Sequence, residues 1–363
     1  MLREAARLSA RAGTFDYTEP DSHTAAATGA PPMALLDVDR LTTAFPIEGR
    51  AASAVSGVSF SLDAGETLAL VGESGCGKSL TALSILRLVD PPGQIVGGAV
   101  RLDGRDLLTL DERAMRSVRG REIGLVLQEP MTALNPVYTV GSQIAEALEV
   151  HGLARGQAAR ARAIELLEAV RVPDPQRRVD DYPHQLSGGL RQRALIAAAL
   201  ACQPKLLIAD EPTTALDVTI QGQILDLLRD LKARFRLALL LITHDLGVVA
   251  QQADRVAVMY AGRIVEEAPV RTLFRDPKHP YTRGLLASLP GGHGTRLRAI
   301  EGTVPRLGHI PAGCAFAPRC PNRFEPCVDL PALVPGSEGG QPVRCFLHHR
   351  VRETAAPAMP PAV

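Results

Sequence analysis

Glycines, a lysine and a serine combine in the first quarter of the chain into a pattern that binds phosphate. Residues 72–79 read G-E-S-G-C-G-K-S and match the pattern G-x-x-x-x-G-K-S/T in full. Backbone amides can converge on phosphate oxygens there, because glycines permit tight turns and close approach. A helix that begins at the loop points the positive end of its dipole at the same anion. The pattern assigns Lys78 to the β- and γ-phosphates of a nucleotide and the Ser79 hydroxyl to Mg²⁺, and the predicted phosphate site comprises Gly72, Ser74, Gly75, Cys76, Gly77, Lys78, Ser79 and Leu80.

Two acidic residues end a second apolar run and could complete the chemistry. The run L-L-I-A at residues 206–209 leads directly into Asp210 and Glu211. A buried strand that ends in this way delivers both carboxylates to the carboxyl edge of a sheet, where α/β folds bind nucleotides. Asp210 suits Mg²⁺, held through water, and Glu211 suits the general base that polarises an attacking water. Alone, such a pair is more often a helix cap or a solvated edge.

Strands and helices must alternate along the chain to position these residues. Short apolar alternations at residues 34–64 indicate an antiparallel layer, and further strands are expected at 68–71, 99–102, 122–127, 206–210, 237–243, 256–260 and 263–266. Helical periodicity is expected from about Gly77 and at residues 140–151, 158–172, 189–201 and 220–234. The alternation predicts an α/β fold with a largely parallel sheet covered on both faces.

Composition limits the class of protein. The chain has 363 residues and a formal net charge of +1, so nothing argues for an electrostatic nucleic-acid binder. No apolar run approaches the ~20 residues that cross a bilayer, and charges and glycines interrupt every apolar stretch before Met33. We therefore expect a soluble, cytosolic protein, and these properties leave open that it docks on a membrane-embedded partner. We expect residues 1–33 and 351–363 to be disordered tails, 34–271 an ATPase domain with a helical insert at about 129–185, and 272–350 a carboxy-terminal extension.

A serine and two glycines before the second half of the fold add another anion site. Residues 186–193 read L-S-G-G-L-R-Q-R, and Ser187, Gly188 and Gly189 would start a helix whose amides and dipole grip a γ-phosphate. With the phosphate loop and the strand ending in Asp210 and Glu211, this segment resembles the nucleotide-binding subunits of ATP-binding-cassette (ABC) transporters. Leu190 stands where the usual residue is Gln. The resemblance implies a P-loop NTPase fold of the ABC type and a head-to-tail dimer, in which this segment contacts the opposite subunit's ATP.

The resemblance also assigns roles to single residues. Gln128, which follows the run I-G-L-V-L, would sense Mg²⁺ and the attacking water, and Ser79, Gln128 and Asp210 would surround the Mg²⁺. His244, after L-L-L-I-T, would contact the γ-phosphate, and Asp217 in A-L-D at residues 215–217 would communicate across the dimer. Phe45 would stack on adenine, or simply belong to the core. Glu211, His244 and Gln128 are thus the predicted catalytic residues.

Four longer segments narrow the resemblance to one branch. Q-E-P-M-T-A-L-N-P at 128–136, Y-P-H-Q-L-S at 182–187, D-P-K-H-P-Y-T-R-G-L-L-A-S-L-P at 276–290 and I-P-A-G-C-A-F-A-P-R-C at 310–320 resemble the ATPases of oligopeptide, dipeptide and nickel importers. The resemblance implies ATP hydrolysis that energises peptide uptake, with nickel or another small solute as the alternative cargo. It implies two permease subunits that contact residues 131–138, a second homologous ATPase in a heterodimer (a homodimer being the fallback), and an extracytoplasmic binding protein. The chain would lie at the cytoplasmic face of the membrane. A soluble ABC ATPase that acts on DNA or ribosomes is the competing class; the single cassette and the short insert argue against it.

Four cysteines gather in the extension. Cys314, Cys320, Cys327 and Cys345 are separated by five, six and seventeen residues, and four thiolates can hold zinc tetrahedrally or an iron–sulfur cluster. The spacing leaves the metal open, and four reduced thiols that pack a small module are the alternative. In at least part of the resembling family this segment carries a [4Fe–4S] cluster, which the resemblance favours here. His348 and His349 could substitute as ligands.

Overall fold

Apolar alternation in the first described residues produces an antiparallel sheet. The structure, a computed structural model, describes residues 34–214, 216–289, 300–335 and 340–349. Its first sheet has the strand order β2-β1-β4-β5, made of β1 (Leu36–Ile47), β2 (Arg50–Leu62), β4 (Gln94–Leu102) and β5 (Arg105–Asp106). Neighbouring strands are antiparallel, and β1 carries register shifts against β2 between Val38 and Ala44. The predicted antiparallel layer is confirmed.

The second sheet carries the residues predicted to do the chemistry. Five parallel strands lie in the order β9-β3-β8-β7-β6: β3 (Thr67–Val71), β6 (Ile123–Val126), β7 (Leu206–Asp210), β8 (Ala238–Thr243) and β9 (Arg255–Tyr260). Strands β3, β7 and β8 are buried at every position, as strands covered on both faces must be. An antiparallel edge follows β9, namely β10 (Arg263–Pro269), β12 (Pro342–Val343) and β11 (Val334–Pro335). The sheet is therefore mixed, with the predicted parallel strands at its centre.

Helices connect the strands, and polar residues cap several of them. Asp111, Thr139, Asp217 and Asp245 each accept a backbone N–H at the start of a helix, which satisfies donors that the helix itself leaves unpaired. The α-helices are α2 (Lys78–Ile85), α3 (Glu112–Val118), α4 (Pro130–Ala133), α5 (Val140–Val150), α6 (Gln157–Ala169), α7 (Pro175–Arg178), α8 (Gly188–Ala199), α9 (Val218–Phe235), α10 (Leu246–Gln252), α11 (Val270–Arg275) and α12 (Pro280–Ala287). Short 3-10 helices are η1 (Leu107–Thr109), η2 (Pro183–Gln185), η3 (Ala317–Arg319), η4 (Glu325–Val328) and η5 (Phe346–His348).

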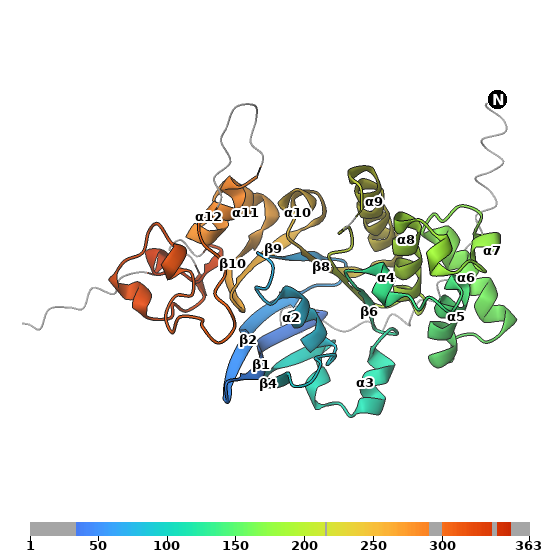
Figure 1. Cartoon of the computed structure of the whole chain (residues 1–363), viewed down its shortest axis with the longest axis horizontal. Helices are drawn as coiled ribbons and strands as arrows, with labels where there is room; N and C mark the ends of the chain where they lie inside the picture. The colour runs from blue at the N-terminus through green and yellow to red at the C-terminus, as the bar shows by residue number, and fades with distance from the viewer. Residues whose placement is uncertain (1–33, 215, 290–299, 336–339, 350–363) are drawn as a thin grey trace, which may run out of the picture. The chain divides into compact units, whose positions relative to one another are not determined.

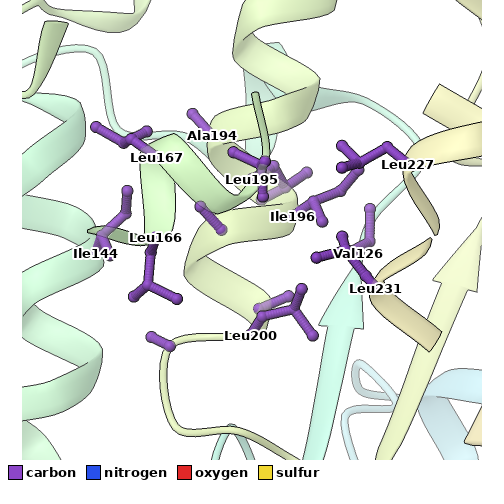
Figure 2. Close-up of a cluster of buried hydrophobic side chains, with 14 of the residues drawn as sticks. Val126, Ile144, Leu166, Leu167, Ala194, Leu195, Ile196, Leu200, Leu227 and Leu231 are labelled. Atoms are coloured by element: carbon purple, nitrogen blue, oxygen red, sulfur yellow. The ribbon is translucent and has the colours of Figure 1, made fainter. Parts of the chain in front are cut away.

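One apolar cluster joins the helical insert to the main sheet. Helices α4 to α7 form the insert, which lies between β6 and α8 in the sequence (Figure 1). Helices α4, α5 and α6 all contact α8. Ile144 and Leu166 of the insert, Ile196 of α8, Val126 of β6 and Leu227 of α9 belong to the same buried cluster (Figure 2). Helix α8, which begins at the Ser187–Gly189 segment, therefore contacts both the insert and strand β6 of the sheet.

The carboxy-terminal extension shares the main sheet. Its strand β12 pairs with β10, and the Arg344 amide donates to the Val265 carbonyl at 2.8 Å. Fully buried Glu266 of β10 accepts the backbone N–H groups of Lys278 at 2.6 Å and His279 at 2.9 Å. Contacts join the described residues from 34 onward into one compact unit, while the division at residue 272 stays a prediction.

Three predictions concern residues that the structure does not describe. The tails predicted at 1–33 and 351–363, and Ala215 of the A-L-D segment, lie outside the described residues. Within the described ranges, no helix is both long enough and apolar enough to cross a bilayer.

Candidate functional site

The phosphate loop turns between β3 and α2 at two positions that only glycine fits. Gly77 precedes α2 with φ of 106°, and a Cβ there would lie 2.8 Å from the Ala54 carbonyl oxygen. A Cβ on Gly72 would lie 2.2 Å from the Met259 carbonyl oxygen. Both distances are too short for a side chain, so the backbone passes against β9 and β2 as the glycines permit. The loop predicted from the sequence is thus built by close backbone packing.

Lys78 is buried in this loop, and its ammonium group contacts backbone carbonyls of the loop. Its Nζ donates to the carbonyl of Gly72 at 2.9 Å and to that of Glu73 at 3.1 Å. A cavity of about 300 Å³ opens beside it, bordered by Ser74, Gly75, Gly77, Ser79, Leu80, Gln128 and Glu211. That volume lies at the lower end of the range for small-molecule sites, and the lining combines backbone amides, a cation and a carboxylate.

Asp210 and Ser79 bring oxygen atoms together at the end of β7. Burial raises the pKa of the Asp210 carboxyl, although the interaction with the Ser79 side chain opposes the rise. Asp210 Oδ1 is buried, with no hydrogen-bond partner in the described structure. A buried carboxylate oxygen without a partner is costly, and oxygen is the ligand type that Mg²⁺ prefers. The two residues therefore fit the predicted Mg²⁺ site.

Glu211 contacts the other two residues predicted to be catalytic, Gln128 and His244. Gln128 Nε2 donates to Glu211 Oε2 at 3.0 Å, and His244 Nδ1 lies 3.1 Å from Oε1. Thr214 Oγ1 donates to Oε2 at 2.8 Å. Burial opposes ionisation of Glu211, but the hydrogen bonds from Thr214 and His244 outweigh it and hold its pKa below the usual value. The carboxylate therefore remains charged near neutral pH and can accept a proton.

The backbone at Glu211 is also unusual. Its φ is 46°, in the left-handed region that non-glycine residues rarely occupy, and its N–H donates to the Ile242 carbonyl at 2.8 Å. Strain of this kind persists only where surrounding contacts enforce it, and it concentrates at functional sites. Thr214, the residue that sequence reasoning missed here, stands only three residues after Glu211 in P-T-T.

The Ser187–Gly189 segment lies at the start of α8, away from the lining of the phosphate cavity. Ser187 caps the helix by accepting the Leu190 N–H at 3.4 Å. A Cβ on Gly189 would lie 2.7 Å from Cγ2 of Ile220 in α9, so glycine lets the two helices approach closely. Asp217 caps α9 by accepting the Ile220 N–H at 2.9 Å. Neither Asp217 nor the segment 187–189 borders this chain's own cavity.

Phe45 does not border the cavity either. A Cβ on Gly93 would lie 2.6 Å from two atoms of the Phe45 ring, so the ring packs against that glycine. Pro305, Leu307 and Ile310 of the extension border the cavity instead. Sequence reasoning missed these three residues, and the composition of residues 300–310 carries no signal that could have found them.

A buried arginine of the extension holds the phosphate loop. Arg319 Nη1 donates to Glu73 Oε2 at 2.7 Å and Nη2 to Oε1 at 3.0 Å, a bidentate pair. The Glu73 N–H also donates to the Tyr281 hydroxyl at 2.8 Å. Hydrogen bonding to Glu73 raises the pKa of Arg319 above its usual value, so the guanidinium is always charged. The second residue of the loop is therefore fixed from both its carboxylate and its amide.

The four cysteines of the extension border one small cavity. Cys314, Cys320, Cys327 and Cys345 line it, and the backbone N–H of Cys314 donates to the Cys327 carbonyl at 3.1 Å. Burial raises the pKa of Cys314 and Cys320, and raises that of Cys345 to about 11; the neighbouring thiols add to each rise. All four are free thiols. Within the described residues, no group of three or more His, Cys, Asp or Glu side chains is arranged as a metal site.

Comparison with known proteins decides the family. The family description "ABC transporter" matches residues 55–214, and "Oligopeptide/dipeptide transporter, C-terminal region" matches residues 265–327. The chain is 53% identical over 321 residues to the probable peptide ABC transporter ATP-binding protein y4tR of Sinorhizobium fredii, covering 87% of this chain and 96% of the relative. It is 51% identical over 318 residues to the oligopeptide transport ATP-binding protein AppD of Bacillus subtilis, covering 86% and 97%. The chain belongs to the ABC transporter ATP-binding family.

Solved structures of ABC ATPases share the fold. The dimeric ATP-binding cassette MJ0796, in a post-hydrolysis state bound to ADP and Pi, matches with a TM-score of 0.59 at 28% identity, over 65% of this chain and 99% of that chain. The cbiO1 protein of the cbiONQ transporter from Clostridium perfringens matches with a TM-score of 0.57 at 25% identity, over 67% and 91%. The predicted P-loop fold of the ABC type is confirmed, and this ABC protein is an ATPase. ATP and Mg²⁺ are the usual ligands of such ATPases.

Proposed function

We propose that this chain binds and hydrolyses ATP to drive the import of peptides through a membrane permease. The observation that carries the proposal is the Glu211 carboxylate, held by Gln128, Thr214 and His244 beside the phosphate-loop cavity. Glu211 takes a proton from the attacking water, while Gln128 and His244 orient that water and the γ-phosphate. Mg²⁺, held by Ser79 and Asp210 with Gln128 nearby, would neutralise phosphate charge.

A second ATP-binding subunit would complete the site. Ser187, Gly188 and Gly189 lie outside the lining of this chain's own cavity, and a helix start of this kind suits an anion. We place this segment on the γ-phosphate of the opposite subunit's ATP, with Asp217 communicating across the interface. The solved MJ0796 cassette is dimeric, which supports a dimer of ATP-binding subunits. Our proposal is a heterodimer with a homologous ATPase, and a homodimer is the alternative.

The insert would receive the permease at the cytoplasmic face of the membrane. Met131, Val137 and Tyr138 are exposed apolar residues at the start of the insert, in a region rich enough in apolar surface to suit a partner. The Met131 sulfur contacts the Arg191 guanidinium, whose Nε donates to the Leu186 carbonyl at 2.9 Å. A movement of α4 is thereby transmitted to the helix that carries Ser187.

Peptide is the proposed cargo, with nickel or another small solute as the alternative. Both relatives are named for peptide or oligopeptide transport, and the match at residues 265–327 is to a region of oligopeptide and dipeptide transporters. Cargo would be selected by the permeases and by an extracytoplasmic binding protein.

Capture of the intact complex tests this function. Tagged Glu211→Gln chain is purified from its native membranes with ATP present, and its partners are identified by mass spectrometry. Two permeases, a second ATPase and a binding protein that carries peptide are expected. Ribosomal or DNA-repair partners without any membrane protein would overturn the transport proposal and leave the ATPase intact.

We also propose that the four cysteines hold a [4Fe–4S] cluster, with zinc as the alternative. The convergence of Cys314, Cys320, Cys327 and Cys345 on one cavity supports it, since four thiolates are the donor set of such a cluster. Bound there, the cluster would tie together four positions of a loop-rich segment. Protein purified without oxygen is assayed for iron, sulfide and zinc. The same assay is made on Cys320→Ser, which removes one of the four thiols, and on Cys202→Ser as its control, because Cys202 does not border the cavity. Equal iron and sulfide support the cluster, zinc alone supports the alternative, and substoichiometric metal throughout would favour four packed thiols.

A further inference from the structure

A second cavity continues outward from the phosphate-loop cavity. It measures about 560 Å³ and lies between the tip of the β1–β2 hairpin, including Ile47 and Ala52, and residues 307–310 of the extension. The two cavities share Ala261, Leu307 and Ile310 as lining residues. A nucleotide whose phosphates lie on the loop at Lys78 must extend its ribose and base away from the loop. The shared residues mark where that extension enters the second cavity.

The walls of the second cavity have the chemistry that a nucleoside needs. Ile47, Leu307 and Ile310 are half-buried apolar side chains that face it from opposite sides, and apolar surface of this kind suits the faces of a flat base. Ser53, Ser56 and Arg263 also border it, and hydroxyl and guanidinium groups can hydrogen-bond ribose. Phe45 is absent from its lining. The apolar contact with a base would therefore come from Leu307 and Ile310 of the extension and from Ile47 at the hairpin tip.

Two contacts fix the extension against the rest of the site. Gly308 has φ of 90°, and a Cβ there would lie 3.3 Å from Cγ2 of Ile47, so glycine lets the extension rest on the hairpin. Arg319, while it binds Glu73, also donates to the carbonyls of Ile300 at 3.3 Å, Glu301 at 2.8 Å and Gly302 at 3.2 Å. The chain that leads into residues 305–310 is therefore anchored on the phosphate loop itself.

We propose that residues 305–310 form one wall of the nucleoside subsite, in which Leu307 and Ile310 contact the base of ATP against Ile47. The inference rests on the proposed ATP binding at the phosphate loop. It makes the carboxy-terminal extension part of the nucleotide site, and Leu307 and Ile310 determinants of affinity for the nucleoside rather than for the phosphates.

Comparing the binding of ATP with that of inorganic tripolyphosphate separates affinity for the nucleoside from affinity for the phosphates. Dissociation constants for both are measured on full-length Glu211→Gln chain carrying Leu307→Ala, Ile310→Ala or both. Each truncation is expected to weaken ATP binding roughly 10-fold, which corresponds to about 1.4 kcal/mol of lost apolar contact. Tripolyphosphate binding should not change. Leu307→Met, which conserves volume, should restore ATP affinity.

Matched variants and a label complete the test. Val328→Ala, which truncates an exposed apolar residue of the same extension, should leave ATP affinity unchanged. Photolysis of bound 8-azido-ATP should label peptides that contain residues 305–310 or 47–53. Unchanged ATP affinity in the double variant, equal losses for ATP and tripolyphosphate, or labelling confined to other segments would overturn the inference. Wild-type chain that binds neither ligand would instead refute ATP binding at the loop.

Discussion

The ion pair between Arg319 and Glu73 is the contact whose removal tests most directly how the extension supports the phosphate loop. The Arg319 side chain is 5% exposed and that of Glu73 is 30% exposed, so water reaches the carboxylate but hardly reaches the guanidinium. Arg319→Met removes the charge and keeps most of the aliphatic volume. The substitution leaves the partly hydrated Glu73 carboxylate without its ion-pair partner. It also removes the donor to three backbone carbonyls, at residues 300–302, which are mostly exposed. Removing one partner of a fully buried pair costs about 3–5 kcal/mol, and access of water to Glu73 lowers our expectation to about 2–3 kcal/mol.

A double-mutant cycle isolates the pair from its surroundings. Unfolding by urea is followed for wild type, Glu73→Gln, Arg319→Met and the double variant. Because each single change already breaks the same bidentate contact, the double variant should be only slightly less stable than the worse single variant, which gives a coupling energy of about 2 kcal/mol. Arg160→Met is the matched control: its pair with Asp180 has side chains 48% and 65% exposed, so its loss should change stability by less than about 1 kcal/mol.

Additive effects at Glu73 and Arg319 would refute this reasoning. Coupling below about 0.5 kcal/mol is the value expected of independent sites, and it would mean that the two side chains do not act as one unit in solution. The same variants should be compared for ATP and tripolyphosphate binding. Arg319→Met should weaken the binding of ATP more than that of tripolyphosphate, because Arg319 also anchors the segment that leads to Leu307.

Three further predictions concern the chemistry at the loop. Glu211→Gln should still bind ATP but hydrolyse it ~10²–10⁴-fold more slowly, the usual contribution of a general base; near-normal single turnover would remove Glu211 from that role. Lys78→Ala should abolish nucleotide binding or productive hydrolysis, whereas unchanged ATP affinity and rate would contradict the phosphate-loop assignment. Thr214→Val removes a hydrogen bond that lowers the pKa of Glu211. The carboxylate must be ionised to act, so activity falls as pH drops through its pKa; a raised pKa should move the acid limb of the ATPase pH profile to higher pH, and an unmoved limb would count against Glu211 as the titrating group.

The parts of the site that could be predicted are those encoded by local sequence. The phosphate loop follows β3, the acidic pair lies at the end of β7, and Gln128 and His244 follow β6 and β8 within two positions. Parallel strands bring those ends to one edge of a sheet, so Gln128, Glu211 and His244 meet although 83 residues separate the first two. The strand runs were sufficient to place these residues at strand ends, because each strand has a strong pattern of its own, whereas the roles of Gln128 and His244 were assigned by the resemblance to ABC transporter subunits.

The contacts that could not be predicted are between segments with no pattern. Arg319 reaches Glu73 across 246 residues, and although it lies in the segment I-P-A-G-C-A-F-A-P-R-C, nothing in that segment indicates that its arginine pairs with the phosphate loop. Strand β12 has only two residues, too few for any period to be visible, so its pairing with β10 could not be predicted from the sequence.

Phe45 lies in a strand whose irregular register makes the orientation of its side chains hard to predict from the sequence. Strand β1 shifts register against β2 between Val38 and Leu41, between Leu41 and Thr43, and between Thr43 and Ala44. Each such irregularity changes which side chains face which side. Counting alternate residues along β1 therefore does not reveal that Phe45 packs against Gly93.

The separation between Glu73 and Arg319 also sets the order in which the protein is completed during translation. At ~5–20 residues per second, a ribosome needs roughly 10–50 s to proceed from one residue to the other across their 246-residue separation. During that interval the nascent chain carries its phosphate loop but lacks the arginine that holds it, the wall at residues 305–310 and strand β12. A truncated mRNA that ends before the Arg319 codon yields a polypeptide whose phosphate loop lacks the Arg319 ion pair. Nucleotide binding would therefore indicate that synthesis has reached the extension. Full-length chains would then be the ones that ATP stabilises as they leave the ribosome.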